Sequence, residues 1–455
     1  MTRGRWLAVA AACIALAVLV VVVRALAGTG GDPTAAAAPP AHDPPAAFAV
    51  SPGVQLPAAA AEDPLPVVLR GLDAVIGTGD GLQVFDTRSG ETRRTVAALD
   101  DADGGAPASA PGPAVSWGVG SGSPSATPAV ELTGSRPAVP TVVDVAGRPA
   151  VVAAFPVGVA GHGTTVGHPA VALLAVDAVT YAPVARVRID LPPSLSDGDR
   201  LRDARVVGAD VGLLVVVAHR GADDAATTYA VDPVTGRIGW QRPGFEAAAV
   251  LAHRAIGVAS VSAGAGGGAS GGGGGDGVRP AALRAGDGTP AWTGTGPPAR
   301  SVGLWAAGPA LVAVTTTGAV DGARTLAMLD AATGATRASR PSDGGISCRY
   351  DERSTTVCAQ DGSGQAWAAG FDAVTGRQLW ELPDAAAGRV APEVSTAWHG
   401  VVYGRTENGP VALDAGTGAD RPVAPGAAPA LVNAYVGITA ATLTTPHAMA
   451  YQAIS

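Results

Sequence analysis

The segment Phe371-Asp-Ala-Val-Thr-Gly-Arg-Gln-Leu-Trp380 contains the pattern that decides the fold, Asp-x-x-(Thr/Ser)-Gly, which we call the repeat phrase. An Asp at the head of a turn accepts hydrogen bonds from the backbone two residues on, and Gly takes the positive-φ position that closes a hairpin loop. The full copies are Asp86-Thr-Arg-Ser-Gly90, Asp232-Pro-Val-Thr-Gly236, Asp330-Ala-Ala-Thr-Gly334, Asp372-Ala-Val-Thr-Gly376 and Asp414-Ala-Gly-Thr-Gly418. Each copy lies between two apolar runs, so the sequence predicts strand, tight turn, strand.

Two degenerate copies bring the total to seven. They run from Asp177 to Tyr181, where Tyr replaces Gly, and from Arg284 to Gly288, where Arg replaces Asp. From Tyr181 onwards the closing residues are 55, 52, 46, 42 and 42 residues apart. Periods of about 40 to 50 residues with several strands each are typical of propeller blades. We therefore predict an all-β fold, a β-propeller of about seven four-stranded blades, or eight if the phrase-free interval from Leu99 to Ala170 holds one more.

The segments Asp73–Gly90 and Phe371–Trp380 resemble the repeat of the pyrroloquinoline-quinone-like β-propeller family, and the resemblance extends from about Val67 to the C-terminus. That family includes quinoprotein alcohol dehydrogenases and many non-catalytic members, such as the outer-membrane assembly lipoprotein of Gram-negative bacteria. In the family a Trp of the repeat packs between neighbouring blades. The resemblance implies this role for Trp240, Trp292 and Trp380, each four residues after its Gly.

Both ends of the propeller are expected in one blade. The segments Leu431–Ile438 and Ala448–Ile454 carry two predicted strands without a phrase, and Val67–Val96 carries a complete phrase near the other end. Pairing these ends would remove the exposed sheet edges.

The N-terminal residues predict a membrane anchor. Arg3 and Arg5 precede an apolar run that begins at Trp6, so residues 1–5 would form a cytoplasmic tail and residues 6–27 a transmembrane signal anchor. Cleavage after the small-x-small site that ends at Ala27 is an alternative, and lipidation at Cys13 is a weaker one. Residues 28–66 are predicted to be a Pro- and Ala-rich disordered linker, residues 67–455 the propeller, and residues 264–277 a disordered Gly-rich loop within it. The chain is thus expected to be a single-pass protein of the cell membrane, with its bulk extracytoplasmic.

Composition excludes several functions. All 30 basic residues are Arg, which excludes Schiff-base chemistry and a phosphate-loop Lys. A net charge of −8 argues against a nucleic-acid partner. The bias towards Ala, Gly, Val and Arg indicates a high-GC, actinobacterial source.

Cys348 and Cys358 flank a predicted strand, polar turn and strand, so a hairpin could set them opposite each other. In an oxidising exterior this arrangement predicts a structural disulfide. A redox site like the adjacent-cysteine pair of quinoprotein dehydrogenases is the alternative, but the spacing does not match it.

Other candidate sites are isolated in the sequence. His162 and His168 lie in a Gly-rich segment without a third metal ligand, and Trp398-His399 precedes an apolar run. Asp80, Asp287 and Asp361, each followed by Gly, fit hairpin turns rather than calcium loops. We therefore predict no catalytic residue, no cofactor and no metal site.

Three hypotheses follow for the function. The first is a non-catalytic, membrane-tethered propeller that serves as a scaffold for an envelope protein, a peptide or a cell-wall ligand. The second is the sensing ectodomain of a system whose signalling domain belongs to another chain. The third is a quinoprotein dehydrogenase, which would need carboxylates for Ca²⁺, a catalytic Asp and adjacent cysteines; the sequence lacks the cysteines.

Overall fold

The computed structural model describes residues 40–62, 64–99, 130–133, 136–161, 164–191, 201–220, 225–261, 277–361, 366–442 and 445–454. The chain divides into two compact units, residues 1–40 and 41–455, and the described strands all belong to the second. Within the described ranges, the structure contains β-strands and one short 3-10 helix, η1 (Ala58–Ala61), and no helix that is long and apolar enough to cross a membrane. The predicted anchor at residues 6–27 lies outside those ranges.

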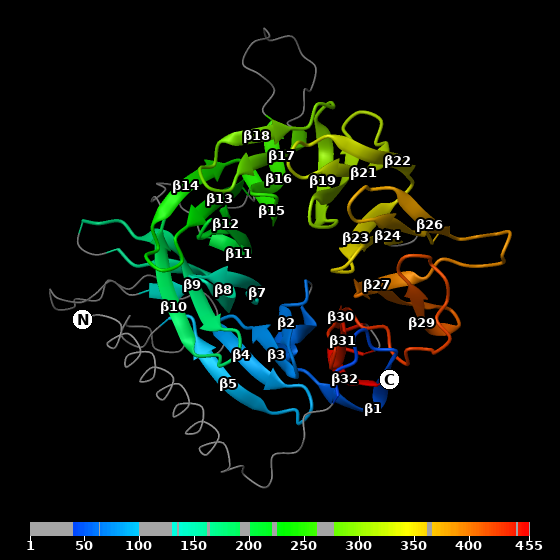
Figure 1. Ribbon diagram of the computed structural model, residues 1–455. Coiled ribbons are helices and arrows are strands. Elements are labelled where there is room, and N and C mark those ends of the chain that lie inside the picture. The colour runs from blue at the N-terminus through cyan, green and yellow to red at the C-terminus, as the bar shows by residue number, and fades with distance from the viewer. Residues whose placement is uncertain are drawn as a thin grey trace, which may run out of the picture. The chain divides into compact units, whose positions relative to one another are not determined.

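The strands form successive antiparallel meanders, which we call blades 1 to 8 in chain order, and one pairing, Val278 with Ala299, joins blades 4 and 5 into a single sheet (Figure 1). Blade 1 contains β2 (Val67–Arg70), β3 (Asp73–Gly77), β4 (Gly81–Asp86) and β5 (Thr92–Ala97); blade 2 contains β7 (Thr141–Val145), β8 (Arg148–Val159), β9 (His168–Asp177) and β10 (Pro183–Asp190), with β6 (Val130–Leu132) also on β8; blade 3 contains β11 (Leu201–Asp210), β12 (Leu213–Arg220), β13 (Ala225–Val231) and β14 (Ile238–Pro243); blade 4 contains β15 (Phe245–Leu251), β16 (Arg254–Val261), β17 (Gly277–Arg284) and β18 (Pro290–Thr293).

The second half of the unit continues the pattern. Blade 5 contains β19 (Ala299–Ala306), β20 (Leu311–Gly318), β21 (Arg324–Asp330) and β22 (Thr336–Ser342); blade 6 contains β23 (Gly345–Tyr350), β24 (Thr355–Asp361), β25 (Ala368–Asp372) and β26 (Gln378–Leu382); blade 7 contains β27 (Glu393–Trp398), β28 (Val401–Thr406) and β29 (Gly409–Asp414); blade 8 contains β30 (Leu431–Val432), β31 (Val436–Thr439), β32 (Met449–Ile454) and β1 (Ala47–Gln55).

The hydrophobic core lies in the seams between consecutive blades. Each buried apolar cluster joins two neighbours: for example, one cluster joins Ile256 of blade 4 to Val312 of blade 5, and another joins Ile76 of blade 1 to Ile438 of blade 8. The remaining clusters join the other consecutive pairs in the same way. Because blade 8 packs on blade 1, the seams run round a closed ring, which is the arrangement of a β-propeller.

The ring closes in blade 8, where β1 pairs antiparallel with β32, with Ala47 opposite Ile454 (blue beside red in Figure 1). The prediction that both ends of the chain share a blade is confirmed, but the prediction of which N-terminal segment joins that blade was wrong. We expected it from Val67–Val96, which instead forms blade 1. Ala47–Gln55 lies in the segment assigned to a disordered linker. The sequence did not reveal this strand, because it contains Pro52 and Pro within an apolar run weakens a strand prediction.

The predicted number of blades also needs correction. The seven phrase copies lie in blades 1 to 7, and blade 8 has none. The interval from Leu99 to Ala170 hides no further blade within its described residues, because β7 and β8 belong to the blade of the Asp177 copy. Blade 7 has three strands rather than four. Pro422 and Pro425 follow its phrase, and Pro cannot donate to a strand ladder.

Candidate functional site

The full repeat phrases form hairpin turns. In the copy at Asp232, Oδ1 accepts hydrogen bonds from the backbone N–H of Val234 (2.8 Å) and Thr235 (3.1 Å), and Gly236 has φ +70°. These two N–H groups lower the pKa of Asp232 below its ordinary value. The same turn holds the other copies together, at Asp86 with Gly90, Asp330 with Gly334, Asp372 with Gly376 and Asp414 with Gly418.

The degenerate copy at Tyr181 shows why Tyr can replace Gly. Tyr181 adopts the positive φ of +56°, a strained conformation for a residue with a Cβ. Its hydroxyl donates to Asp73 Oδ2 of blade 1 (2.9 Å), and the Asp73 carboxylate also pairs with Arg93 (3.0 Å). The substituted side chain therefore ties blade 2 to blade 1.

Each of three tryptophans connects its blade to the phrase of the next, in a contact that we call the Trp latch. Trp240 Nε1 donates to the Ala285 carbonyl (2.8 Å), Trp292 to Ala331 (3.0 Å) and Trp380 to Ala415 (2.7 Å). The indole covers the phrase Gly, since a Cβ added at Gly288 would lie 2.7 Å from Trp240 and one at Gly334 2.6 Å from Trp292. Glycine is thus required there by positive φ and by close contact.

Blade 5 lacks the latch. Ala338 occupies the position four residues after Gly334, and its cross-strand partner is Met328. In the latched blades the small residue lies on the third strand and the large one on the fourth. These pairs are Ala230 with Trp240, Ala282 with Trp292 and Gly370 with Trp380. At Gly376 an added Cβ would meet Met328 Cβ and Arg337 Cβ, both at 3.2 Å, instead of an indole. Blades 5 and 6 therefore contact each other directly at this turn.

A small cavity lies beside the missing latch. It measures about 70 Å³ and is lined by Leu326, Met328, Ala338 and Arg340 of blade 5 and by Phe371 and Gln378 of blade 6. Leu326, Met328 and Phe371 are buried, so the floor is apolar. The cavity therefore lies beside the position of the missing indole, while Met328 occupies the contact with the phrase residue Gly376.

A polar bridge crosses the seam next to this cavity. The Arg340 guanidinium lies 4.3 Å from the centre of the Trp367 ring, and its Nη2 is 3.0 Å from Glu381 Oε1. Trp367 Nε1 donates to the same oxygen (2.6 Å), and Gln378 donates to Glu381 Oε2 (2.8 Å). Burial raises the pKa of Glu381, but the contacts with Arg340, Trp367 and Gln378 outweigh it and hold the pKa below its ordinary value.

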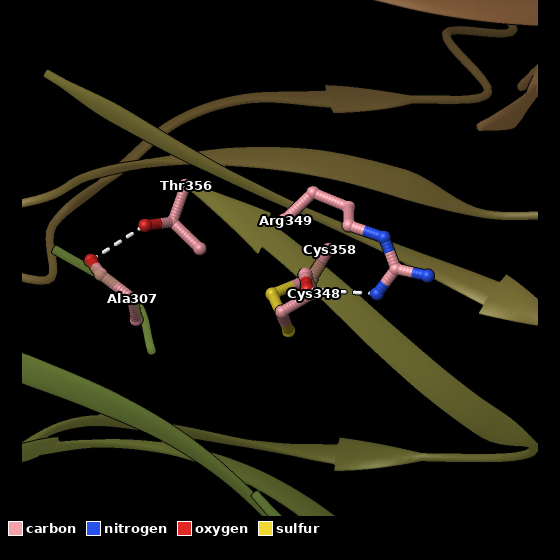
Figure 2. The surroundings of a disulfide bond; sticks show 5 residues. All are labelled: Ala307, Cys348, Arg349, Thr356 and Cys358. Atoms are coloured by element: carbon pink, nitrogen blue, oxygen red, sulfur yellow. Dashed lines mark hydrogen bonds between the residues drawn. A yellow bond between two sulfur atoms is a disulfide. The ribbon is translucent and has the colours of Figure 1, made fainter. Parts of the chain in front are cut away.

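The disulfide between Cys348 and Cys358 lies under the same seam. It links β23 to β24 within blade 6, which confirms the disulfide predicted from the hairpin (Figure 2). Both cysteines are buried in one cluster with Met328 and Phe371. Beside them, Thr356 Oγ1 of blade 6 donates to the Ala307 carbonyl of blade 5 (2.6 Å), as Figure 2 shows.

The meander sorts the connections onto two faces. First-to-second and third-to-fourth strand connections lie on one face, the turn face, where complete turns such as Val211-Gly212 and 232–237 contain two to six residues. The connections from second to third strand, and from the fourth strand to the next blade, begin and end on the opposite face, the loop face. Those that the structure describes in full range from one residue, Gly244, to the ten residues 383–392. One face is uniform and the other varied.

The chain enters the ring at the turn face. Asp43 accepts a hydrogen bond from Arg353 Nη2 (3.1 Å) and contacts His399 Nδ1, and both partners lie in first-to-second strand turns. Tyr403 donates to the Pro45 carbonyl (2.6 Å). The residues before β1 are therefore fixed on blades 6 and 7.

The other sequence candidates are dispersed. His168 lies 3.3 Å from Asp190 in blade 2, and no group of three or more His, Cys, Asp and Glu that could hold a metal occurs in the described part of the chain. Asp287 accepts the N–H of Thr289 in its turn, which supplies the acceptor that Arg284 cannot. His399 stacks on Trp398 at 3.8 Å. His162 and Cys13 lie outside the described residues.

Sequence reasoning missed the seam between blades 5 and 6. Ala338 stands where three other copies have Trp, but Arg94, Ala185 and Pro422 occupy the same position in the remaining copies, so this position did not single out the seam. The contacts of Arg340 with Trp367 and Glu381 join residues with no common pattern.

No protein-family model matches the sequence, and no curated protein matches it. Among solved structures, BamB from Moraxella catarrhalis is similar at 14% identity and a TM-score of 0.40, covering 88% of this chain and 98% of that one. Sqt1 from Saccharomyces cerevisiae has 9% identity and a TM-score of 0.33, covering 84% and 93%. Quinohemoprotein alcohol dehydrogenase from Comamonas testosteroni has 14% identity and a TM-score of 0.32, covering 85% and 66%. Likenesses this distant include both an enzyme and non-enzymes and transfer no function to this chain.

Proposed function

We propose that the protein is a non-catalytic binding scaffold, a propeller that presents its loop face to a protein partner at the cell envelope and is tethered to the membrane by residues 6–27. The observation that carries the proposal is the sorting of connections onto two faces. Tight turns held by the phrase carboxylates build a uniform face, and connections of very different length leave the other. Binding residues are typically placed on variable loops that a rigid scaffold positions.

The entry of the chain supports this orientation. Because Asp43 is fixed at the turn face, a tether that precedes it would attach there and leave the loop face accessible. The net charge of −8 favours a protein or peptide partner over a nucleic acid.

Site-specific photo-crosslinking in intact cells tests the proposal with matched positions. Val166 on the loop face and Val234 on the turn face are 59% and 63% exposed, so a photoreactive residue is equally accessible at either. We expect a discrete crosslinked protein from position 166, and from the exposed Val320 on the same face, but none from position 234. Crosslinking from position 234 alone, or from no position, would contradict the proposal.

The enzyme alternative has its own test. We expect titration of the full-length protein with pyrroloquinoline quinone and Ca²⁺ to give no dye reduction with short alcohols or sugars. Stoichiometric quinone binding with turnover would reverse the assignment.

A further inference from the structure

We propose that the seam between blades 5 and 6 is a docking slot on the outer rim for an aromatic side chain of a partner protein. This goes beyond the proposed function, because the slot lies between outer strands and not on the loop face. Either idea can fail without the other.

The occupant is inferred from the molecule's own seams. In three seams an indole lies between the outer strand of one blade and the phrase Gly of the next, and Nε1 finds a carbonyl acceptor. The seam between blades 5 and 6 keeps one of these neighbours in register, the apolar residue that precedes the phrase. Phe371 precedes its phrase as Leu283 and Leu329 precede theirs, and these two Leu residues share clusters with Trp240 and Trp292.

Ala338 has no ring to insert, and Met328 packs on the phrase residue Gly376 in place of an indole. Met328 fills part of the space and leaves about 70 Å³ between Phe371, Leu326 and Ala338. A whole ring needs more room, since an engineered cavity that binds benzene measures about 150 Å³. Met is unbranched and has three rotatable bonds, so Met328 can move aside at low cost where Val or Ile could not.

The rim of the slot suits an amphipathic aromatic group. Glu381 and Trp367 hold the Arg340 guanidinium at one side, and Gln378 presents an amide next to it. Tyr and Trp bury an apolar ring and need a polar partner for one group, and both are enriched where proteins meet. The apolar floor and fixed polar edge match that chemistry.

Binding of 5-fluoroindole, followed by fluorine NMR of the ligand with the full-length protein in detergent, tests the slot. Trp292→Ala serves as the positive control, because it empties a slot that holds an indole in the native protein. We expect saturable binding to the native protein and binding at least about tenfold tighter to Met328→Ala, which removes Cγ, Sδ and Cε and frees their volume. The double variant Met328→Ala/Ala338→Trp, in which the chain supplies its own indole, should lose binding.

Two results would overturn the slot. One is binding to Trp292→Ala without binding to the native protein or to Met328→Ala. The other is binding that the double variant retains, which would place the probe elsewhere.

The role in partner binding has a cellular readout. A photoreactive residue at Ser339, which is exposed beside the slot, should crosslink a protein in the native background and fail to do so in the double variant. A crosslink of equal yield in both backgrounds, or in neither, would overturn the partner role. Equal amounts of the two proteins, with the same resistance to protease in intact cells, serve as the control for folding and for abundance.

Discussion

The seam between blades 4 and 5 and the seam between blades 5 and 6 solve one packing problem in two ways. In the first, Trp292 covers Gly334 and donates to the Ala331 carbonyl, opposite the small residue Ala282. In the second, Met328 and Ala338 exchange the roles of large and small partner. Each seam therefore keeps one large and one small residue in the cross-strand pair, although Met328 with Ala338 leaves a cavity of about 70 Å³.

The two seams also differ in their other contacts. The seam without the latch contains the Arg340 bridge and the disulfide, and both lie in or next to the cluster that includes Met328. The latched seam has the indole with its hydrogen bond instead. Removing each device tests how much stability it supplies.

The largest effect is expected for Trp292→Ala. Truncating a Trp in a packed site costs about 3–5 kcal/mol, and the lower end applies because Trp292 is half-buried. Trp292→Phe keeps the ring contact with Gly334 and loses the donor to Ala331, which costs about 1 kcal/mol. Urea unfolding followed by circular dichroism measures both. Equal losses for Ala and Phe would mean that the hydrogen bond, and not the ring, fixes the latch.

Removing the disulfide should destabilise the other seam by a similar amount. Loop-closure entropy for a separation of 10 residues gives roughly 3 kcal/mol for the Cys348→Ala/Cys358→Ala variant. The same unfolding measurement in a thiol reductant is the control, because the native protein should then approach the variant. A gap that persists in reductant would show that packing of the sulfurs, and not the covalent bond, supplies the stability.

Rebuilding the latch in blade 5 is expected to have an intermediate effect on stability. The first substitution destabilises the protein, and the second restores stability. Ala338→Trp alone overfills the seam and costs about 1–3 kcal/mol. Adding Met328→Ala should recover most of this loss, with a coupling energy of at least about 1 kcal/mol in a double-mutant cycle. Additive effects would refute the view that the side chains at positions 328 and 338 compete for one space.

The smallest effect concerns the phrase carboxylates at low pH. Arg337 lowers the pKa of Asp330 below its ordinary value, with Thr333 contributing, and Arg337 is also the residue that packs on Gly376. A carboxyl whose folded pKa is lowered stabilises the fold above its unfolded pKa of about 3.9 and loses that contribution as pH falls through the lower folded value. Asp330→Asn should therefore lower the free energy of unfolding at pH 7 by less than about 1 kcal/mol, seen as a slightly lower Tm. Near pH 2 the variant and the native protein should have the same Tm. A Tm difference that is the same at both pH values would exclude this charge effect.

Most of the architecture could be predicted from the sequence because the repeat phrase reports local chemistry. An Asp acceptor and a positive-φ Gly act within five residues, so the turns of blades 1 to 7 were visible without a structure. Blade 8 could not be predicted in the same way, because its strands come from opposite ends of the chain. It has no phrase, and β1 is recognisable only through its pairing with β32 at the other end of the chain.

The contacts between blades could be predicted only in part. The three Trp residues followed from a fixed distance to the phrase, but Tyr181 bonding to Asp73 and Arg340 bridging to Glu381 depend on which blades become neighbours. No periodicity encodes such pairs. Ala338 was a visible departure from the repeat, yet only the register shows that Met328 stands opposite it.

The closure of blade 8 also constrains how the protein can mature. Its outer strand is the first described strand of the chain, and the strand it pairs with is the last, so this contact spans nearly the whole unit and forms late on entropic grounds. When a chain emerges N-terminus first from a ribosome or a translocation pore, β1 stays unpaired until β32 has also emerged. Asp43 and Pro45 precede this unpaired strand and Pro52 lies within it. Pro on an exposed edge discourages pairing with other chains. Proteases would then act on any copy whose synthesis stops before Met449, since its ring would remain open.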